Sequence, residues 1–334
     1  MMKRLLASAL VVVAMALPAR AEVSTLRIGV QFGLGYLPVY VMRDAGLLDA
    51  ELKKAGLAPI PVDIHNFTGA PDIGDGLLSG SLDIGGGGIT AMMVAWDKTR
   101  NAGDRAMRGI VALSAMPYEL LTNNPNMKTL ADITDKDRIG LPAVKVSFPA
   151  VMLQIAAERE FGVGKHDRFN AMTVGLAGPE GATALLTNNG VVDGYTFAAP
   201  FIQQLRGKPG IHKVWSSSDV FGTPTTALAT WTTEKFRAQN PKTYAAFFAA
   251  MHEANRFIAE HPEEAAAIYL KAEQSKLPLA LIVECIKDPE MAYNTAPKNS
   301  GALSDFLTRI GTLKQRPASW KDLFFPEVTS EQGS

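Results

Sequence analysis

Short apolar runs alternate with amphipathic stretches after residue 22, a pattern typical of strands followed by helices. In the first part of the chain it predicts strands over 26–30, 61–67, 81–85 and 109–114, and helices over 40–48, 70–78 and 89–96. In the middle part it predicts strands over 118–122, 138–141, 171–174, 192–197 and 225–232, and helices over 147–161 and 179–188. The last part predicts helices over 241–260, 263–271, 278–286 and 300–310. The fold class is therefore α/β, with mainly parallel sheets.

The strand and helix pattern restarts after about residue 115, which indicates two lobes. Strand-like crossings near 115–122 and 221–228 lead into the second lobe and back. We therefore predict a discontinuous first lobe of residues 22–115 and 223–334, a second lobe of residues 116–222, and a two-strand hinge. Ligands of such proteins bind between the lobes, and closure buries them.

Residues 1–21 have the features of a secretory signal peptide. Lys3 and Arg4 precede an apolar run over 5–17, and small residues at 19 and 21 predict cleavage after Ala21. The apolar run has about 13 residues, fewer than the roughly 20 that span a bilayer. We therefore expect a soluble, exported protein, located in the periplasm if the host has two membranes.

The composition excludes several classes of function. The 33 basic and 33 acidic side chains cancel, whereas nucleic-acid binders usually carry a basic excess.

Cys285 is the only cysteine, so intramolecular disulfides and thiolate metal clusters are excluded. We expect Cys285 to be a small buried side chain. The five histidines have no spacing that directs two of them at one metal. The motifs G-x-S-x-G, H-E-x-x-H and the P-loop are absent, and we predict no catalytic residue, metal or cofactor.

Five glycine-rich or polar turns each follow a predicted strand and precede a predicted helix. In an α/β sheet such turns lie at the carboxyl ends of strands, where ligands bind near exposed helix N–H groups. Thr90 and Ser147 can each cap a helix and offer a hydroxyl. Any one turn also fits a purely structural role, and it is their number and order that favour a shared cleft. The turns are 31–36, 68–71, 85–90, 145–149 and 175–178.

Several stretches resemble the periplasmic solute-binding proteins of ABC importers for nitrate, taurine and aliphatic sulfonates, which include relatives of thiamine-precursor binders. They are 26–29, 46–48, 77–85 and 192–194 with Pro200, so the resemblance covers nearly all of the chain after residue 22. It implies a two-lobe type II periplasmic-binding-protein fold and no catalysis. It also implies delivery of one captured solute to an ABC permease driven by a cytoplasmic ATPase, without a cofactor. We expect a monomer.

Three departures from this family indicate the charge of the ligand. Ile89 stands where many relatives have the acid of Gly-Asp-Thr, and Ala199 where relatives often have an acid before the proline. A buried amine needs an acidic partner, so an ammonium ligand such as taurine is disfavoured. Lys145, in place of a common glycine, favours an anion. We expect a small carboxylate or sulfonate whose anionic end meets Ser147, Lys145 and backbone N–H groups.

The predicted ligand-binding residues come from these turns and the neighbouring strands. They are Gln31, Phe32, Gly33, Leu34, Tyr36, Thr68, Gly69, Gly88, Ile89, Thr90, Ser114, Lys145, Ser147, Phe148, Gly175, Tyr195, Phe197 and Ala198. The apolar body of the ligand is expected against Phe32, Leu34, Tyr36, Ile89, Phe148, Tyr195 and Phe197. For each aromatic residue, packing in the core is the alternative.

Two other functions fit parts of the sequence. An exported sensory subunit that presents its ligand to a membrane receptor would use the same cleft, and the sequence does not separate it from an import receptor. A pyrimidine-precursor synthase shares the fold, but such enzymes rely on a cysteine-rich segment and work inside cells. The single cysteine and the export signal disfavour that enzyme.

Overall fold

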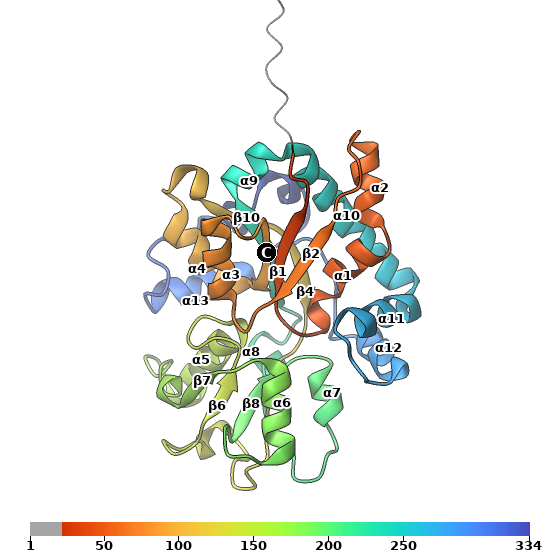
Figure 1. The fold of residues 1–334 in the computed structure, drawn as a ribbon. Coiled ribbons are helices and arrows are strands. Elements are labelled where there is room, and N and C mark those ends of the chain that lie inside the picture. The colour runs from red at the N-terminus through yellow and green to blue at the C-terminus, as the bar shows by residue number, and fades with distance from the viewer. Residues whose placement is uncertain (1–21) are drawn as a thin grey trace, which may run out of the picture.

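The computed structural model describes residues 22–334, so the predicted signal peptide lies outside the described residues. In this part of the chain, two five-stranded sheets lie one above the other, each flanked by helices (Figure 1). No helix in the range 22–334 is both long enough and apolar enough to cross a membrane. We call the sheet nearer the described N-terminus, with its helices, lobe 1, and the other lobe 2.

Lobe 1 is built on the strand order β2-β1-β3-β10-β4. Its strands are β1 (Leu26–Val30), β2 (Val62–Asn66), β3 (Ile84–Gly88), β4 (Met107–Ala115) and β10 (Thr226–Thr233). Its helices are α1 (Leu37–Asp44), α2 (Leu47–Lys54), α3 (Ala70–Ser79), α4 (Ile89–Thr99), α9 (Glu234–Gln239), α10 (Pro241–Glu260), α11 (Pro262–Ala272), α12 (Leu279–Lys287) and α13 (Ser300–Arg309). Both the early and the late parts of the chain therefore belong to lobe 1, as the two colour ranges in Figure 1 show.

Lobe 2 is built on the strand order β7-β6-β8-β5-β9. Its strands are β5 (Glu119–Thr122), β6 (Ile139–Leu141), β7 (Thr173–Gly175), β8 (Gly194–Phe197) and β9 (His212–Ser216). Its helices are α5 (Phe148–Phe161), α6 (Gly178–Thr187), α7 (Phe201–Leu205) and α8 (Ser218–Phe221). The prediction of mainly parallel sheets needs one correction, because β5 and β10 run antiparallel to both of their neighbours. These are the strands that enter lobe 2 and return to lobe 1.

The glycine run of 85–88 is a central strand, and the prediction of a turn there is wrong. β3 lies between β1 and β10, and all of its residues are buried. A Cβ atom on Gly87 would lie 2.9 Å from the Trp231 ring, and one on Gly85 would lie 2.6 Å from the Ile73 side chain. Glycine is therefore required because two large side chains pack directly on this backbone.

The helical regions differ from the prediction in two ways. The helix expected over 40–48 is divided into α1 and α2, because Gly46 adopts a left-handed conformation with φ of 69°. The short elements β9, α7, α8 and α9 were not predicted. They have four to six residues each, too few for a periodic pattern to show.

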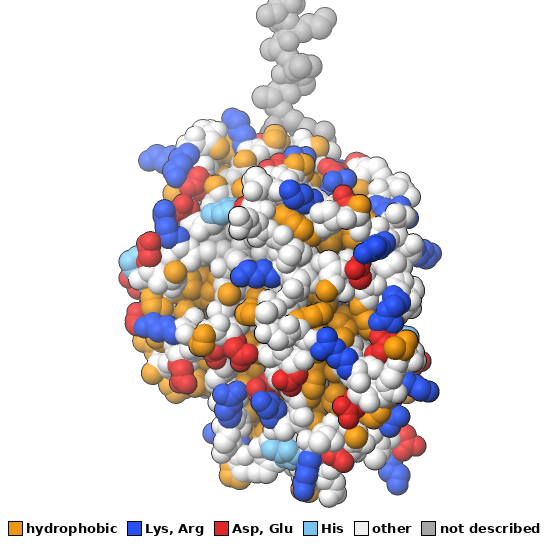
Figure 2. Space-filling view, turned by 180° about the vertical axis from the view of Figure 1, so that it is seen from behind, with side chains coloured by type: hydrophobic (Ala, Val, Ile, Leu, Met, Phe, Trp, Pro, Cys, Tyr) orange, Lys and Arg blue, Asp and Glu red, His pale blue; other side chains and the backbone are white. Residues whose placement is uncertain are grey.

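Two connections join the lobes, one between β4 and β5 and one between α8 and β10. They lie where the sequence predicts the crossings, and the domain boundaries after residues 115 and 222 stay a prediction. On the face of both lobes seen in Figure 2, Lys and Arg side chains are interspersed with Asp and Glu, in keeping with the balanced charge.

Candidate functional site

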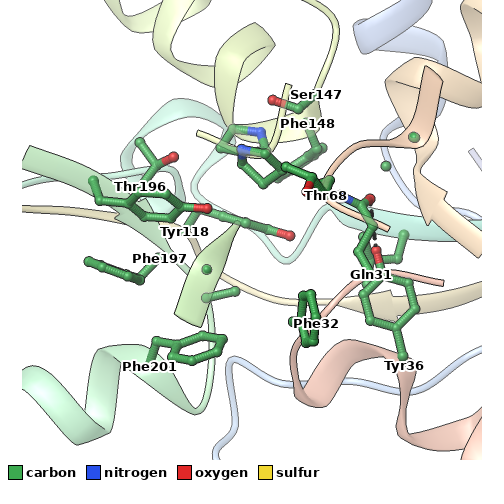
Figure 3. Close-up of a pocket in the computed structure, with 18 residues that line it drawn as sticks. Gln31, Phe32, Tyr36, Thr68, Tyr118, Ser147, Phe148, Thr196, Phe197 and Phe201 are labelled. Carbon is green, nitrogen blue, oxygen red and sulfur yellow. Dashed lines mark hydrogen bonds between the residues drawn. The ribbon is translucent and has the colours of Figure 1, made fainter. Parts of the chain in front are cut away.

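A pocket of about 40 Å³ lies between the two lobes. Figure 3 shows Gln31, Phe32 and Tyr36 on one side of it and Phe197 and Phe201 on the other. Lobe 1 supplies Gln31, Phe32, Tyr36, Thr68, Ala70, Gly88 and Leu228. Lobe 2 and its connection supply Tyr118, Pro142, Ser147, Phe148, Pro149, Gly178, Tyr195, Thr196, Phe197, Ala198 and Phe201. The pocket therefore depends on both lobes.

Within the described chain, four helices of 10 to 14 residues begin at this pocket. Ala70, Phe148 and Gly178 are the first residues of α3, α5 and α6, and Gly88 directly precedes α4. No side chain caps α3, α4 or α5. Because the first N–H groups of a helix lack acceptors within it and form the positive end of its dipole, the pocket favours acceptor oxygens and negative charge.

The side chains that line the pocket are uncharged, since none of the lining residues within 22–334 is Asp, Glu, Lys, Arg or His. Gln31 is held in place: its Nε2 donates to the Thr68 carbonyl at 2.9 Å, and its Oε1 accepts from the Tyr36 hydroxyl at 3.1 Å. Burial raises the pKa of Tyr36, Tyr118 and Tyr195 above the ordinary value, so these phenols keep their protons at neutral pH. This lining can bind a solute through dipoles, and it supplies no side chain that titrates near neutral pH.

The described residues offer little for metal or thiol chemistry. Within 22–334, no group of three or more His, Cys, Asp or Glu side chains is placed to hold a metal ion. Cys285 lies on α12 and is buried, and burial raises the pKa of its thiol to about 12. This fits the predicted role of a small core side chain.

Ten of the predicted residues line the pocket together. They are Gln31, Phe32, Tyr36, Thr68, Gly88, Ser147, Phe148, Tyr195, Phe197 and Ala198. Eight other predicted residues do not line it: Gly33, Leu34, Gly69, Ile89, Thr90, Ser114, Lys145 and Gly175.

Several of these eight residues lie where the lobes touch beside the pocket. The Leu34 N–H donates to the carbonyl oxygen of Ala199 at 3.0 Å. The Thr90 hydroxyl donates to the carbonyl oxygen of Val146 at 2.7 Å. A Cβ atom on Gly69 would lie 3.0 Å from the Pro142 carbonyl oxygen, and one on Gly33 would lie 3.4 Å from that of Ala199. These positions join the lobes around the pocket.

The expected anion contacts of Lys145 and Ser147 need correction. Lys145 adopts a left-handed conformation with φ of 66°, and its exposed side chain does not line the pocket. Ser147 does line it, but its hydroxyl donates to the Ala143 carbonyl at 2.6 Å and caps no helix. Thr90 does not cap α4 either, because it is the second residue of that helix. The anion-favouring groups that remain are the helix N–H groups.

The other predicted residues away from the pocket have structural positions. Ser114 is fully buried on β4, where it pairs with Leu228 of β10. Ile89 is fully buried at the start of α4. Gly175 is exposed at the end of β7.

Sequence reasoning missed eight residues that line the pocket. They are Ala70, Tyr118, Pro142, Pro149, Gly178, Thr196, Phe201 and Leu228. Three of them, Ala70, Pro149 and Gly178, lie within the predicted turns, so the position of these turns is the signal that marks them. Phe201 follows Pro200 on the unpredicted helix α7, and no local signal marks it.

The NMT1-like family matches residues 19–271, about three quarters of the chain. The chain belongs to the NMT1-like family. A search of curated proteins found no match to this NMT1-like sequence.

Solved structures similar to the NMT1-like chain include three ligand-binding proteins. The alkanesulfonate-binding protein SsuA from Xanthomonas axonopodis pv. citri, bound to MOPS, has 16% identity and a TM-score of 0.67 over 89% of this chain and 96% of that one. The periplasmic nitrate-binding protein NrtA from Synechocystis PCC 6803 has 18% identity and a TM-score of 0.68 over 90% and 84%. A zinc-bound ligand-binding component of an ABC-type import system from Staphylococcus aureus has 14% identity and a TM-score of 0.67 over 92% and 98%.

These likenesses show the fold of the NMT1-like chain. The predicted type II periplasmic-binding-protein fold with two lobes is confirmed. The predicted resemblance to sulfonate-binding and nitrate-binding proteins of ABC importers is confirmed as well.

Proposed function

We propose that this protein is the extracytoplasmic solute-binding receptor of an ABC importer. It captures a small organic anion between its lobes and delivers it to a permease driven by a cytoplasmic ATPase. The observation that carries the proposal is the interlobe pocket, where four helix N-termini converge on an uncharged lining. The family match and the fold of the similar binding proteins support it.

The preference for an anion follows from the charges around the pocket. A buried ammonium group needs a carboxylate partner, and the lining residues within 22–334 include no Asp or Glu. Helix N–H groups stabilise a carboxylate or sulfonate without any basic side chain. The rings of Phe32, Phe148, Phe197 and Phe201 favour an anion whose charged group is attached to carbon over a bare inorganic ion.

Binding without chemical change is the second part of the proposal. The lining supplies no side chain that titrates near neutral pH, so general acid and base catalysis have no candidate there.

We place the protein in the periplasm as a monomer, with a signal peptide over residues 1–21. Its first lobe comprises residues 22–115 and 223–334 and its second residues 116–222. The contacts between the rims support a closed state that the solute stabilises relative to an open one.

A thermal-shift screen tests the proposal. The panel contains carboxylates, sulfonates, nitrate and amines of matched size, because tight binding to the native state raises its apparent stability. We expect organic anions to raise the melting temperature and amines to leave it unchanged. Solution scattering is expected to show a smaller radius of gyration with a saturating anion. Binding of amines with no response to carboxylates and sulfonates would overturn the assignment.

A further inference from the structure

A second cavity adjoins the pocket between the lobes. It has a volume of about 510 Å³, against about 40 Å³ for the pocket, and we call it the outer chamber. Phe32 from lobe 1 and Phe201 from lobe 2 line both cavities. Figure 3 shows these two rings at the same end of the pocket. The two cavities are therefore neighbours that share this pair of aromatic side chains in their walls.

Helix α6 runs from the pocket along the outer chamber. Its first residue, Gly178, lines the pocket, whereas Pro179, Ala182, Thr183 and Leu186 line the chamber. Their spacing of three and four residues places these four side chains on one face of the helix. The N–H end of α6 thus lies at the pocket, and a mostly apolar face of the same helix lies along the chamber.

The opposite wall of the chamber comes from lobe 1. Tyr269 near the end of α11 and Leu277 in the segment after it add apolar surface. One acid and one base, Glu273 and Lys276, also line this wall. The Glu273 carboxylate accepts a 2.5 Å hydrogen bond from the Tyr40 hydroxyl, so it is already paired within lobe 1. The chamber therefore offers apolar surface from both lobes, beside one acid and one base on the lobe 1 wall.

The size of the pocket limits what it can enclose. A cavity needs about 10–15 Å³ to hold one water molecule, so about 40 Å³ accommodates a small polar group only. An organic anion whose charged group lies at the helix N-termini must extend its remaining atoms elsewhere. The outer chamber shares two lining residues with the pocket, Phe32 and Phe201, whereas a cavity of about 300 Å³ shares one, Phe148.

We propose that the outer chamber is the subsite for the apolar tail of the bound anion. Phe32 and Phe201 form the passage between head group and tail. The substrate class is then a carboxylate or sulfonate with an alkyl or aryl tail of several carbons. This inference rests on the proposed function, because it assumes an anionic head group in the pocket.

Calorimetric titration with linear n-alkanesulfonates of two, four and eight carbons tests this proposal on the purified protein. Each methylene that leaves water for the chamber is expected to tighten binding about fourfold, so affinity rises with chain length until the chamber is filled.

The variant Leu186→Gln places an amide on the chamber wall. Leu186 is 46% exposed, so the change is compatible with folding. The matched control is Leu78→Gln, at a leucine on α3 that is 42% exposed and lies outside the chamber.

The expected result is that Leu186→Gln weakens binding of the eight-carbon sulfonate about fivefold or more and leaves the two-carbon sulfonate unchanged. Leu78→Gln is expected to change neither. Equal affinities for all three chain lengths, with no effect of Leu186→Gln, would overturn the chamber proposal and leave the receptor function intact. If neither sulfonates nor the matching carboxylates bind at any length, the anion receptor and the chamber proposal both fail.

Discussion

The hydroxyl of Thr90 in lobe 1 donates a 2.7 Å hydrogen bond to the carbonyl oxygen of Val146 in lobe 2. Thr90 is the second residue of α4, and Val146 lies two residues before α5. Both helices begin at the pocket, so this bond joins two of the N-termini that surround the proposed anion. It depends on the lobes being in contact, so the proposed opening of the lobes would break it.

Replacing Thr90 by valine is therefore expected to weaken ligand binding. Valine keeps a similar shape but cannot donate, and loss of one hydrogen bond costs about 0.5–1.5 kcal/mol, or roughly a twofold to tenfold lower affinity. Titration with the tightest-binding anion of the thermal-shift panel measures the effect. Thr187→Val is the control, because the Thr187 hydroxyl also donates to a backbone carbonyl, but within α6. Equal affinities for wild type and Thr90→Val would show that the bond does not contribute to closure.

The sequence predicts most of the fold because the strands are short apolar runs with clear ends. β1 matches its predicted range, and β2 and β10 lie within one residue of theirs. The run of glycines in β3 predicts a turn, because glycine is depleted in strands. The glycines are explained by tertiary packing, because the Ile73 and Trp231 side chains pack directly on this backbone.

The candidate site is less predictable than the fold. Strand ends and helix starts bring ten predicted residues to the pocket, since both features are local in sequence. The direction in which a side chain points cannot be inferred from the local sequence. Lys145 lies in a predicted turn, but its side chain is exposed and does not line the pocket. Leu228 reaches the pocket from the third position of β10, a position that only strand pairing can specify.

Gly69 provides a steric test of lobe closure. Its backbone is extended, so alanine fits the conformation, but the new Cβ would lie 3.0 Å from the Pro142 carbonyl oxygen of lobe 2. Crowding of this kind costs about 1–3 kcal/mol, so Gly69→Ala is expected to lower ligand affinity about fivefold or more. Gly74→Ala within α3, the helix that directly follows Gly69, is the control, because a Cβ there meets no atom within 4 Å. If Gly69→Ala binds as tightly as Gly74→Ala, the rims do not approach as closely as described.

Glu273 makes stability depend on pH near neutrality. Burial raises the pKa of this carboxyl from 4.5 to about 7, although the Tyr40 hydroxyl and the Gly33 N–H oppose the rise. The unfolded chain then loses the proton at a lower pH than the folded one, so stability falls as pH rises from about 4.5 to about 7. Glu273→Gln removes this group, and we expect it to be more stable than wild type at pH 8 and similar at pH 4.5. Urea unfolding at both pH values measures the difference in unfolding free energy between Glu273→Gln and wild type. The same difference at pH 4.5 and pH 8 would contradict the raised pKa of Glu273.

An ion pair between Glu158 of α5 and Arg309 of α13 links the lobes away from the pocket. The hydrogen bonds from Arg309 lower the pKa of Glu158 from 4.5 to about 2, and the Gly164 N–H adds to this. Because the pKa of Glu158 is lower in the folded state than in the unfolded chain, its ionised carboxylate stabilises the folded state above pH 4.5. This contribution is lost as the pH falls toward 2. Arg309→Met is therefore expected to be less stable than wild type at pH 6, and this difference in the free energy of unfolding is expected to shrink steadily toward pH 2.

Arg316→Met is the control, since Arg316 pairs with Asp305 on the surface of lobe 1 and exposed pairs contribute little. Unfolding curves of the three proteins between pH 2 and 7 measure the gap. A constant gap between wild type and Arg309→Met across this range would mean that Arg309 stabilises the protein through packing on Phe306 and not through the charge of Glu158.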